Sequence, residues 1–325
     1  MHKVPVGVLG ASGYAGRELC GLIARHPGLE LAFASANEQR GQRARIGASE
    51  LIYVATEDAP LHEAEVVFTA LPHGASAKWV RNARATGARV IDLSSDFRPG
   101  AEGTATAKTQ APYGLTELMR ARLPGAEIVA NPGCYPTAIL LAIAPLLMAG
   151  QVLPAATINV SAASGVTGAG YSMRPDLLFA EVAEDFRAYA VGNQHRHIAE
   201  MQAVTMELGG RDNDILFTPH LLPVARGILA TITVPVNDYD EDPSALWRDC
   251  YRGEPFIEIA DQPPSLRDVV RRNVVRLSVA KAANVRQPTL IIISAIDNLV
   301  KGAAGQALQN ANVLLGLSEQ AGLPS

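Results

Sequence analysis

The sequence predicts an α/β protein of two domains, and three observations predict it. A glycine-rich turn joins the first apolar run to a helical pattern, strands and helices then alternate up to residue 148, and longer, more strictly alternating strands follow. At 325 residues the chain is also long for a single core. We expect a parallel sheet covered by helices in residues 1–133 and 298–325, and an α+β domain in residues 134–297.

The first element is a short β-branched run at residues 4–9 that leads into the sequence GASGYAG at residues 10–16. An amphipathic helical pattern continues over residues 17–26, and a second strand pattern follows at 29–35. Glycines at 10, 13 and 16 permit a tight turn and close approach of a ligand, and the helix N-terminus offers N–H groups to a pyrophosphate. A purely structural turn can use the same glycines. The flanking strands nevertheless favour a Rossmann-type dinucleotide-binding domain.

The end of the second strand indicates which dinucleotide is bound. NAD enzymes usually carry an acid there for the ribose 2′-hydroxyl, whereas this chain carries Ser35 and, a little further on, Arg40. A hydroxyl and an arginine suit a 2′-phosphate, so NADP(H) is the expected cofactor. Glu38 weakens this preference, and Arg40 could equally belong to a solvated face.

Further strand–helix alternation extends the parallel sheet. Strands are predicted at 66–71, 89–93 and 127–130, with a helix at about 75–86. Ligands of such sheets bind beyond the carboxyl ends of the strands, which places Arg98 on the expected rim. A guanidinium matches phosphate geometry, so Arg98 is a candidate for binding an anionic substrate group. A salt bridge at the surface is the alternative interpretation of Arg98.

The turn around Cys134 is the strongest chemical signal in the chain. A strand ends at Ala130, Pro132 and Gly133 force a turn, and the apolar segment 137–148 predicts a helix. At a helix N-terminus the backbone N–H groups and the macrodipole favour a thiolate, so we expect a lowered pKa and a nucleophilic sulfur at Cys134. A buried, inert thiol is the alternative, and it is the preferred interpretation of Cys20 and Cys250.

The second domain contains a histidine motif between its strands, which are predicted at residues 157–162, 226–236, 256–259, 274–280 and 289–296. The motif HRHIAE places His195 and His197 at the start of a predicted helix, with Glu200 three residues after His197 on the same face. Zinc ligation by the two histidines lacks a cysteine or carboxylate cluster at ligand spacing, so no metal site is predicted. Beside a candidate thiolate, one imidazole is the natural proton carrier.

The last motif runs from Asp297 to a helix that ends near residue 317. Small residues at 302–305 allow close packing of this helix. Because it follows the last strand of the second domain, the chain is expected to return here to the first domain, with Asn298 beside the cofactor.

Composition excludes several classes of protein. A net charge of −4 gives no sign of a nucleic-acid-binding surface, and three cysteines argue for a reducing compartment rather than a disulfide framework. The longest apolar run, at 138–147, is interrupted by Pro145 and is too short to span a bilayer. No signal peptide is recognisable at the N-terminus. We expect a soluble cytoplasmic protein that contacts neither membrane nor nucleic acid.

Taken together, the motifs resemble those of the N-acetyl-γ-glutamyl-phosphate reductases of arginine biosynthesis. They follow the family's order over nearly the whole chain: GASGYAG at 10–16, LPHG at 71–74, LSSDFR at 93–98, NPGCYPTA at 131–138, SGVTGAG at 164–170, HRHIAE at 195–200, FTPHLLPVARGI at 217–228 and DNLVKGAAGQALQN at 297–310. The resemblance implies NADPH-dependent reduction of an acyl phosphate through a thioester. It also implies a homo-oligomer, a dimer or a tetramer.

The resemblance also assigns roles to residues. Cys134 is the expected nucleophile, and a histidine of the HRH motif is the acid/base; His197 is preferred because of its position relative to Glu200. Substrate-binding roles are expected for Arg98, His195 and Glu200. The loop that includes Ser12 and Tyr14 is expected to hold NADP(H).

Several alternatives stay open on the sequence. Aspartate-semialdehyde dehydrogenases lack the pairing of HRH with DNLVKGAAGQA, and the lysine-pathway reductase of carrier-bound aminoadipyl phosphate usually lacks the NPGCYP form. A non-redox cysteine acyltransferase or hydrolase would not need the glycine loop, and a nucleotide-sensing module would leave the Cys134 turn unexplained. The segment 41–60 is shorter than the family's usual form, and Ser35-Ala36-Asn37 replaces a serine–arginine pair.

Overall fold

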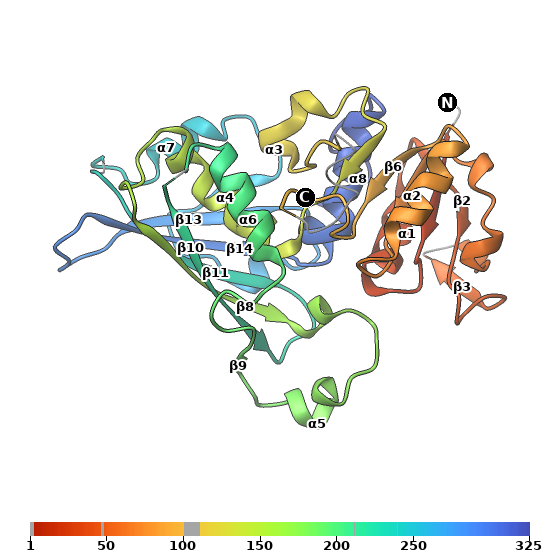
Figure 1. The fold of residues 1–325 in the computed structure, drawn as a ribbon, viewed down its shortest axis with the longest axis horizontal. Helices are drawn as coiled ribbons and strands as arrows, with labels where there is room; N and C mark the ends of the chain where they lie inside the picture. The colour runs from red at the N-terminus through yellow and green to blue at the C-terminus, as the bar shows by residue number, and fades with distance from the viewer. Residues whose placement is uncertain (1–2, 47–48, 101–110, 211, 239) are drawn as a thin grey trace. The chain divides into compact units, whose positions relative to one another are not determined.

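The computed structural model describes residues 3–46, 49–100, 111–210, 212–238 and 240–325. It divides into two compact units: Met1–Gly133 with Ala303–Pro324, and Cys134–Gly302 with Ser325 (Figure 1). The return to the first unit at Ala303 comes later than the sequence-based boundary at Asn298. The reason is local, because the Asn298 side chain is bonded to residues of the second unit.

The first unit is built on a five-stranded parallel sheet in the order β2-β1-β5-β6-β7. Its strands are β1 (Val4–Leu9), β2 (Leu29–Ala34), β5 (Val66–Thr69), β6 (Arg89–Asp92) and β7 (Ile128–Ala130). Apolar side chains on the central strands are buried on both faces, as strands between two helical layers require. The sheet confirms the predicted Rossmann-type α/β fold.

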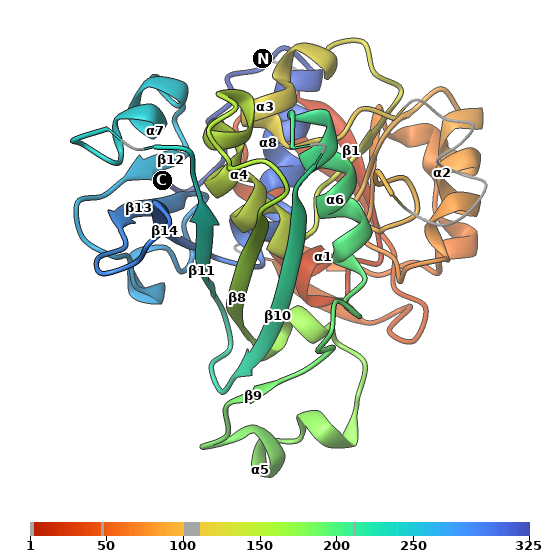
Figure 2. The same cartoon turned by 60° about the vertical axis from the view of Figure 1, so that its left-hand side comes forward.

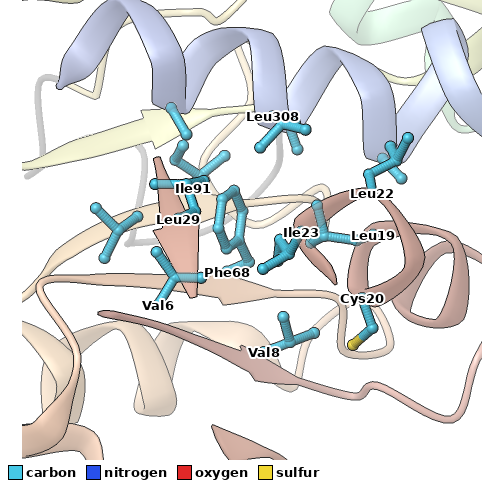
Figure 3. Close-up of a cluster of buried hydrophobic side chains, with 14 of the residues drawn as sticks. Val6, Val8, Leu19, Cys20, Leu22, Ile23, Leu29, Phe68, Ile91 and Leu308 are labelled. Atoms are coloured by element: carbon cyan, nitrogen blue, oxygen red, sulfur yellow. The ribbon is translucent and has the colours of Figure 1, made fainter. Parts of the chain in front are cut away.

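Helices bury each face of this sheet. The side chains of α1 (Tyr14–Arg25) and α8 (Gly305–Leu314) share one core with β1, β2, β5 and β6, and Figure 3 shows Leu19, Leu22, Ile23 and Leu308 around Phe68. Cys20 lies in the same core, where burial raises its thiol pKa to about 12. The predicted burial of Cys20 is thus confirmed. On the opposite face, α2 (Ser76–Ala85) packs Val80 and Ala83 into a second core.

The first unit also contains a small hairpin and a short α-helix. The strands β3 (Arg43–Ile46) and β4 (Ser49–Ile52) form an antiparallel hairpin that the sequence analysis did not predict. A short helix, α3 (Thr116–Met119), precedes β7.

The second unit contains a seven-stranded mixed sheet in the order β12-β13-β14-β11-β8-β10-β9. Its strands are β8 (Thr157–Gly165), β9 (Arg187–Ala188), β10 (Asp214–Leu222), β11 (Ile228–Pro235), β12 (Ile257–Ile259), β13 (Val275–Lys281) and β14 (Thr289–Ile296). Figure 2 shows β8, β10 and β11 side by side. The mixed sheet confirms the predicted α+β character, although β9 and β10 were not predicted.

The helices of this unit are α4 (Cys134–Met148), α5 (Phe179–Val182), α6 (His197–Glu207) and α7 (Ala245–Cys250). Among them α4 is the most buried, since every residue from Tyr135 to Leu147 is buried. Within the described ranges, no helix combines the length and apolarity needed to cross a membrane.

Candidate active site

The candidate nucleophile stands on a firmly anchored helix. Cys134 is the first residue of α4, so its half-buried thiol lies in the first turn, as the sequence predicts. Pro145, inside the helix, has no N–H for the carbonyl of Leu141, and the Tyr251 hydroxyl donates to that carbonyl instead, at 2.6 Å. The carbonyl of Ala142 accepts the indole N–H of Trp247 at 2.8 Å. Anchoring from α7 therefore holds α4 in place despite its internal proline.

A glycine allows the chain to pass close beside the nucleophile. Gly302 lies in a π-helical turn, Val300–Ala304, that precedes α8. A Cβ atom at Gly302 would lie 2.8 Å from the Cβ of Cys134. A side chain at this position would displace Cys134, which gives the small residue at 302 a physical reason.

The two histidines of the HRH motif have different hydrogen-bonding roles. His197 begins α6 and is buried, and its backbone N–H donates to Nδ1 of His195 at 3.1 Å. Nδ1 of His195 is therefore an acceptor, which places the proton of the neutral ring on Nε2. Burial, aided by the charge of Arg196, lowers the pKa of His195 to about 4. His195 is consequently neutral at physiological pH.

Aromatic rings enclose this histidine pair. The ring of Tyr135 meets that of His195 edge to face at a centroid distance of 5.4 Å and that of His197 at 6.2 Å. Phe217 of β10 contacts Tyr135 at 5.0 Å and His195 at 5.4 Å. These contacts fix the planes of the imidazole rings beside Tyr135, the residue that follows Cys134.

A pair of tyrosine hydroxyls links this cluster to the segment after β9. The Tyr135 and Tyr189 oxygens are 3.1 Å apart. Burial raises the pKa of both phenols. Sequence reasoning missed Tyr189 because no local pattern marks it; Tyr135 is signalled only by its place after the cysteine.

Glu200 occupies the first turn of α6 and is 4% exposed. It is three residues beyond His197, so the two side chains share one helix face, as the sequence predicts. The cysteine, both histidines and Glu200 thus all belong to the second unit.

The glycine loop of the first unit has the geometry of a ligand cradle. Gly10 has φ +78°, and a Cβ there would lie 2.4 Å from the Ala70 carbonyl oxygen, while one at Gly16 would lie 2.3 Å from the Gly10 oxygen. Gly10 and Gly16 are thus required by the turn itself. A Cβ at Gly13 would approach nothing closer than 3.6 Å, so the chain's own packing does not demand a glycine there. Ser12 is half-buried in the same loop, and Tyr14, which begins α1, is 36% exposed.

The two residues expected at a 2′-phosphate are placed differently from one another. Ser35 is fully buried; its hydroxyl lies 3.0 Å from that of Thr56 and accepts the Gly10 N–H at 3.4 Å. It therefore supports the glycine loop from beneath and offers no exposed hydroxyl to a ligand. Arg40 is exposed and donates to the Asn37 carbonyl at 3.4 Å, so it is accessible to an anion.

Arg98 lies beyond β6 at the carboxyl edge of the parallel sheet, but inside the unit. It is 4% exposed, and its guanidinium donates to the carbonyl of Leu93 at 2.7 Å and to that of Asn131 at 2.8 Å. These bonds fix the plane of the guanidinium. Its burial places Arg98 away from the surface position that the alternative interpretation assumed.

Asn298 is buried in the second unit, and its predicted place beside the cofactor stays a prediction. Its side chain is 2% exposed, its oxygen accepts the Gly227 N–H at 2.7 Å, and its amide donates to the Thr167 hydroxyl at 3.0 Å. The amide thus joins two loops of the second unit. These bonds depend on loops distant in sequence, so the motif alone could not predict them.

The Rossmann-type first unit and the mixed-sheet second unit define a class, the semialdehyde dehydrogenases. Family models agree: residues 5–126 match "Semialdehyde dehydrogenase, NAD binding domain" and residues 134–298 match "Semialdehyde dehydrogenase, dimerisation domain". Among solved structures, aspartate semialdehyde dehydrogenase II from Vibrio cholerae, complexed with ASA, has a similar fold. Its TM-score is 0.78 at 21% identity, over 97% of this chain and 99% of that one.

Full-length relatives narrow the class. The N-acetyl-gamma-glutamyl-phosphate reductase of Symbiobacterium thermophilum is 41% identical, over 98% of this chain and 97% of its own length. That of Desulfotalea psychrophila is 38% identical over 98% of both chains. The chain belongs to the family of N-acetyl-gamma-glutamyl-phosphate reductases.

Proposed function

We propose that this chain catalyses the NADPH-dependent reduction of N-acetyl-L-glutamyl 5-phosphate to N-acetyl-L-glutamate 5-semialdehyde and phosphate, a step of arginine biosynthesis. The observation that carries the proposal is Cys134 at the start of α4, followed by Tyr135, whose ring packs against both histidines of the HRH motif. Relatives about 40% identical over nearly their whole length carry the name of this activity. A dinucleotide-binding fold in the same chain supports the redox step.

The chemistry begins with the Cys134 sulfur attacking the acyl carbon. A C–S bond forms, the bond from that carbon to the phosphate oxygen breaks, and phosphate leaves with the electron pair. His197 takes the thiol proton. The product is a thioester, which keeps an electrophilic carbon.

The second half-reaction reduces that thioester. A bound nicotinamide cofactor would supply the hydride that this carbon takes up, and the protein's part is to hold the thioester in place and keep water away. When the C–S bond breaks, the sulfur leaves as a thiolate or receives the proton held on His197. His195, held neutral with its proton on Nε2, is suited to donate a hydrogen bond to substrate rather than to carry a proton.

The first unit supplies residues that fit the dinucleotide. The loop over Gly10, Ser12, Gly13 and Tyr14 leads into α1, whose first N–H groups suit a pyrophosphate, and the open space at Gly13 allows close approach. The preference for NADP(H) over NAD(H) rests on Arg40, because Ser35 is buried.

Arg98 is the proposed ligand of the substrate phosphate. Two backbone carbonyls hold its guanidinium in a fixed plane, so the orientation of the guanidinium N–H groups is set before substrate binds. Glu200, buried beside His197, is proposed to contact the substrate's acylamino end or to orient His197. The chain length of the substrate distinguishes this proposal from an aminoadipyl-phosphate reductase.

We also propose that the enzyme is a homo-oligomer, a dimer or a tetramer, in the cytoplasm. The second unit matches a dimerisation-domain model, and a segment of this unit carries several exposed apolar side chains: Tyr171, Met173, Leu178, Phe179, Phe186 and Val191. Exposed apolar side chains gathered in one segment favour contact with another chain. A thiolate nucleophile is maintained in a reducing compartment, which supports the cytoplasm.

The decisive experiment runs the reaction backwards, with phosphate, NADP and three aldehydes: N-acetylglutamate semialdehyde, its one-carbon-longer analogue and aspartate semialdehyde. We expect the first to give the highest kcat/KM. Turnover without NADP would favour an acyltransferase.

The nucleophile is tested separately. Cys134→Ser should abolish turnover and leave NADPH binding, measured by fluorescence, nearly unchanged, because a hydroxyl lacks the acidity and nucleophilicity of a thiol. Cys250→Ser is the matched control and should keep activity. Substantial turnover by the Cys134→Ser variant would show that Cys134 is not the nucleophile.

A further inference from the structure

Asn131, three residues before Cys134, is fixed by an unusual number of contacts. Its side chain is fully buried. Its backbone N–H donates to the Asp92 carbonyl at 2.8 Å, and its own carbonyl accepts from Nε of Arg98 at 2.8 Å. Its side-chain amide donates to the carbonyl of Ala303 at 3.2 Å, and its side-chain oxygen accepts from Nδ2 of Asn310 at 2.9 Å. Four separate bonds thus hold one residue at the start of the Pro132-Gly133 turn.

Two amides of α8 complete this network. Gln306 and Asn310 are one helical turn apart, so they share a face of α8, and both are fully buried. Nδ2 of Asn310 donates to the Gly114 carbonyl at 2.9 Å as well as to Asn131, and its oxygen accepts from the Thr116 hydroxyl at 2.7 Å. Nε2 of Gln306 donates to the same Gly114 carbonyl at 3.0 Å and to Thr116 at 2.7 Å.

The network requires a glycine at position 114. A Cβ there would lie 2.4 Å from Nδ2 of Asn310. Side-chain networks of this size are uncommon in a protein interior, because burying amides without every bond satisfied is costly. A hydrophobic face would pack α8 without the free-energy cost of burying polar groups that lack hydrogen bonds. The polar face therefore needs a reason other than stability.

The position of Asn131 supplies that reason. Beyond it the chain has only Pro132, with a fixed φ, and Gly133 before the nucleophile. Asn131 also bonds Ala303, which follows the glycine that packs on the Cβ of Cys134. A displacement of Asn131 is thus transmitted to the cysteine along both stretches of chain.

We propose that Asn131, Asn310, Gln306 and Thr116 are positioning residues that set the place of the Cys134 sulfur. This inference rests on the proposed role of Cys134 as the nucleophile. Displacements of about 1 Å reduce enzymatic rates by up to about a hundredfold, so a small displacement of these four residues should have a large effect on turnover.

Asn310→Asp tests the proposal with a nearly isosteric change. The variant keeps an acceptor for Thr116, loses both donors, and sets a carboxylate against the oxygens of Asn131 and Gly114. We expect kcat to fall by about 10- to 100-fold, with KM values within about threefold of wild type. Alkylation of Cys134 by iodoacetamide, followed by peptide mass spectrometry, should slow and show an altered pH dependence.

Asn312→Asp is the matched control. Asn312 lies in the same helix and is equally buried. Its amide donates to the carbonyls of Glu319 and Ala321 and not to the residues around Asn131. It should destabilise the protein to a similar degree and leave kcat and Cys134 alkylation within about threefold of wild type. Equal effects of the two variants on alkylation would overturn the proposal and leave the network a purely structural one.

Thr116→Val and Thr116→Ser provide a second pair should Asn310→Asp fail to fold. Valine removes the hydroxyl that connects Gln306 to Asn310, and serine keeps it. The proposal requires slow alkylation and low kcat in the valine variant and recovery of both in the serine variant; equal behaviour of the pair contradicts it. Failure of the proposed function is separate, because it would appear as a wild-type Cys134 no more reactive than Cys250.

Discussion

At the scale of single residues, a backbone hydrogen bond distinguishes two histidines that the sequence presents as a pair. The N–H of His197 occupies Nδ1 of His195, and protonation of that nitrogen would break the bond. Burial acts in the same direction, so the folded protein holds His195 neutral well below neutral pH. The sequence alone preferred His197 through its spacing to Glu200, and the hydrogen bond gives an independent reason for the same choice.

The histidine assignment predicts different responses to substitution. His197→Gln should lower kcat by about a hundredfold or more, as expected for loss of a general acid/base. His195→Gln should raise substrate KM and leave the shape of the kcat profile unchanged between about pH 5 and 8, because a group with a pKa of about 4 does not titrate there. Initial rates across this range check both. Loss of an ionisation from the profile of the His195 variant would reverse the assignment.

Arg98 combines a structural bond with a proposed ligand role, and Arg98→Lys separates them. Lysine cannot reproduce a planar fork, and losing a charge-assisted contact costs about 1.5–3 kcal/mol, or roughly one to two decades in kcat/KM. The KM for phosphate in the reverse reaction should therefore rise much more than that for NADP. Measurement of both KM values in the Arg98→Lys variant tests the proposed contact between Arg98 and phosphate. Parallel changes would mean that Arg98 serves only the carbonyls of Leu93 and Asn131.

At the scale of elements, the sequence predicted the helices and strands whose position is determined by a local pattern of apolar residues. The strands of the parallel sheet, α1, α4, α6 and β14 were predicted within a few residues, because each has a clear apolar period with a glycine, proline or polar boundary. β10 was missed because it contains Pro219, which argues against a strand, and β9 because it has only two residues. The placements of Ser35 and Asn298 depend on partners distant in sequence. No local pattern reports those partners.

The proline inside α4 leads to a prediction about the element that carries the nucleophile. Tyr251→Phe would leave the Leu141 carbonyl buried without its hydroxyl donor, which should destabilise the protein by about 1–3 kcal/mol. In a Pro145→Ala background the same change should cost less, because alanine restores the helical N–H to that carbonyl. Urea unfolding of the four proteins gives the comparison. An equal loss in both backgrounds would show that the hydroxyl does not compensate for the proline.

At the scale of the whole chain, the first unit is closed by its last residues. His26, directly after α1, is buried; its Nδ1 accepts the Gly28 N–H at 3.0 Å, and its Nε2 lies 3.0 Å from the oxygen of Asn312 in α8. The ring leaves no space for a side chain at Gly322, where a Cβ would lie 2.4 Å from it. One imidazole thus joins the N-terminal part of the chain to the C-terminal segment.

This joint should make stability depend on pH. Burial lowers the pKa of His26 in the folded protein below its ordinary value of 6.5, and the bond from Gly28 requires an unprotonated Nδ1. The unfolded chain therefore binds a proton on His26 at a higher pH than the folded chain does. The stabilisation is fully present above about pH 6.5 and is lost as pH falls from there toward the folded pKa.

His26→Gln removes the titrating group and keeps a polar side chain, while His195, which acts in the same direction, is unchanged in both proteins. Between about pH 7.5 and 5, wild type should lose more stability than the variant, because the folded-state pKa of His26 lies below its ordinary value. Protection of the amides in residues 317–323 from hydrogen exchange, corrected for the intrinsic exchange rate at each pH, should fall at low pH in wild type only, because the protonated ring would release the C-terminal segment. Identical pH dependences in the two proteins would mean that the His26 bonds survive protonation, and that the C-terminal segment is held by α8 alone.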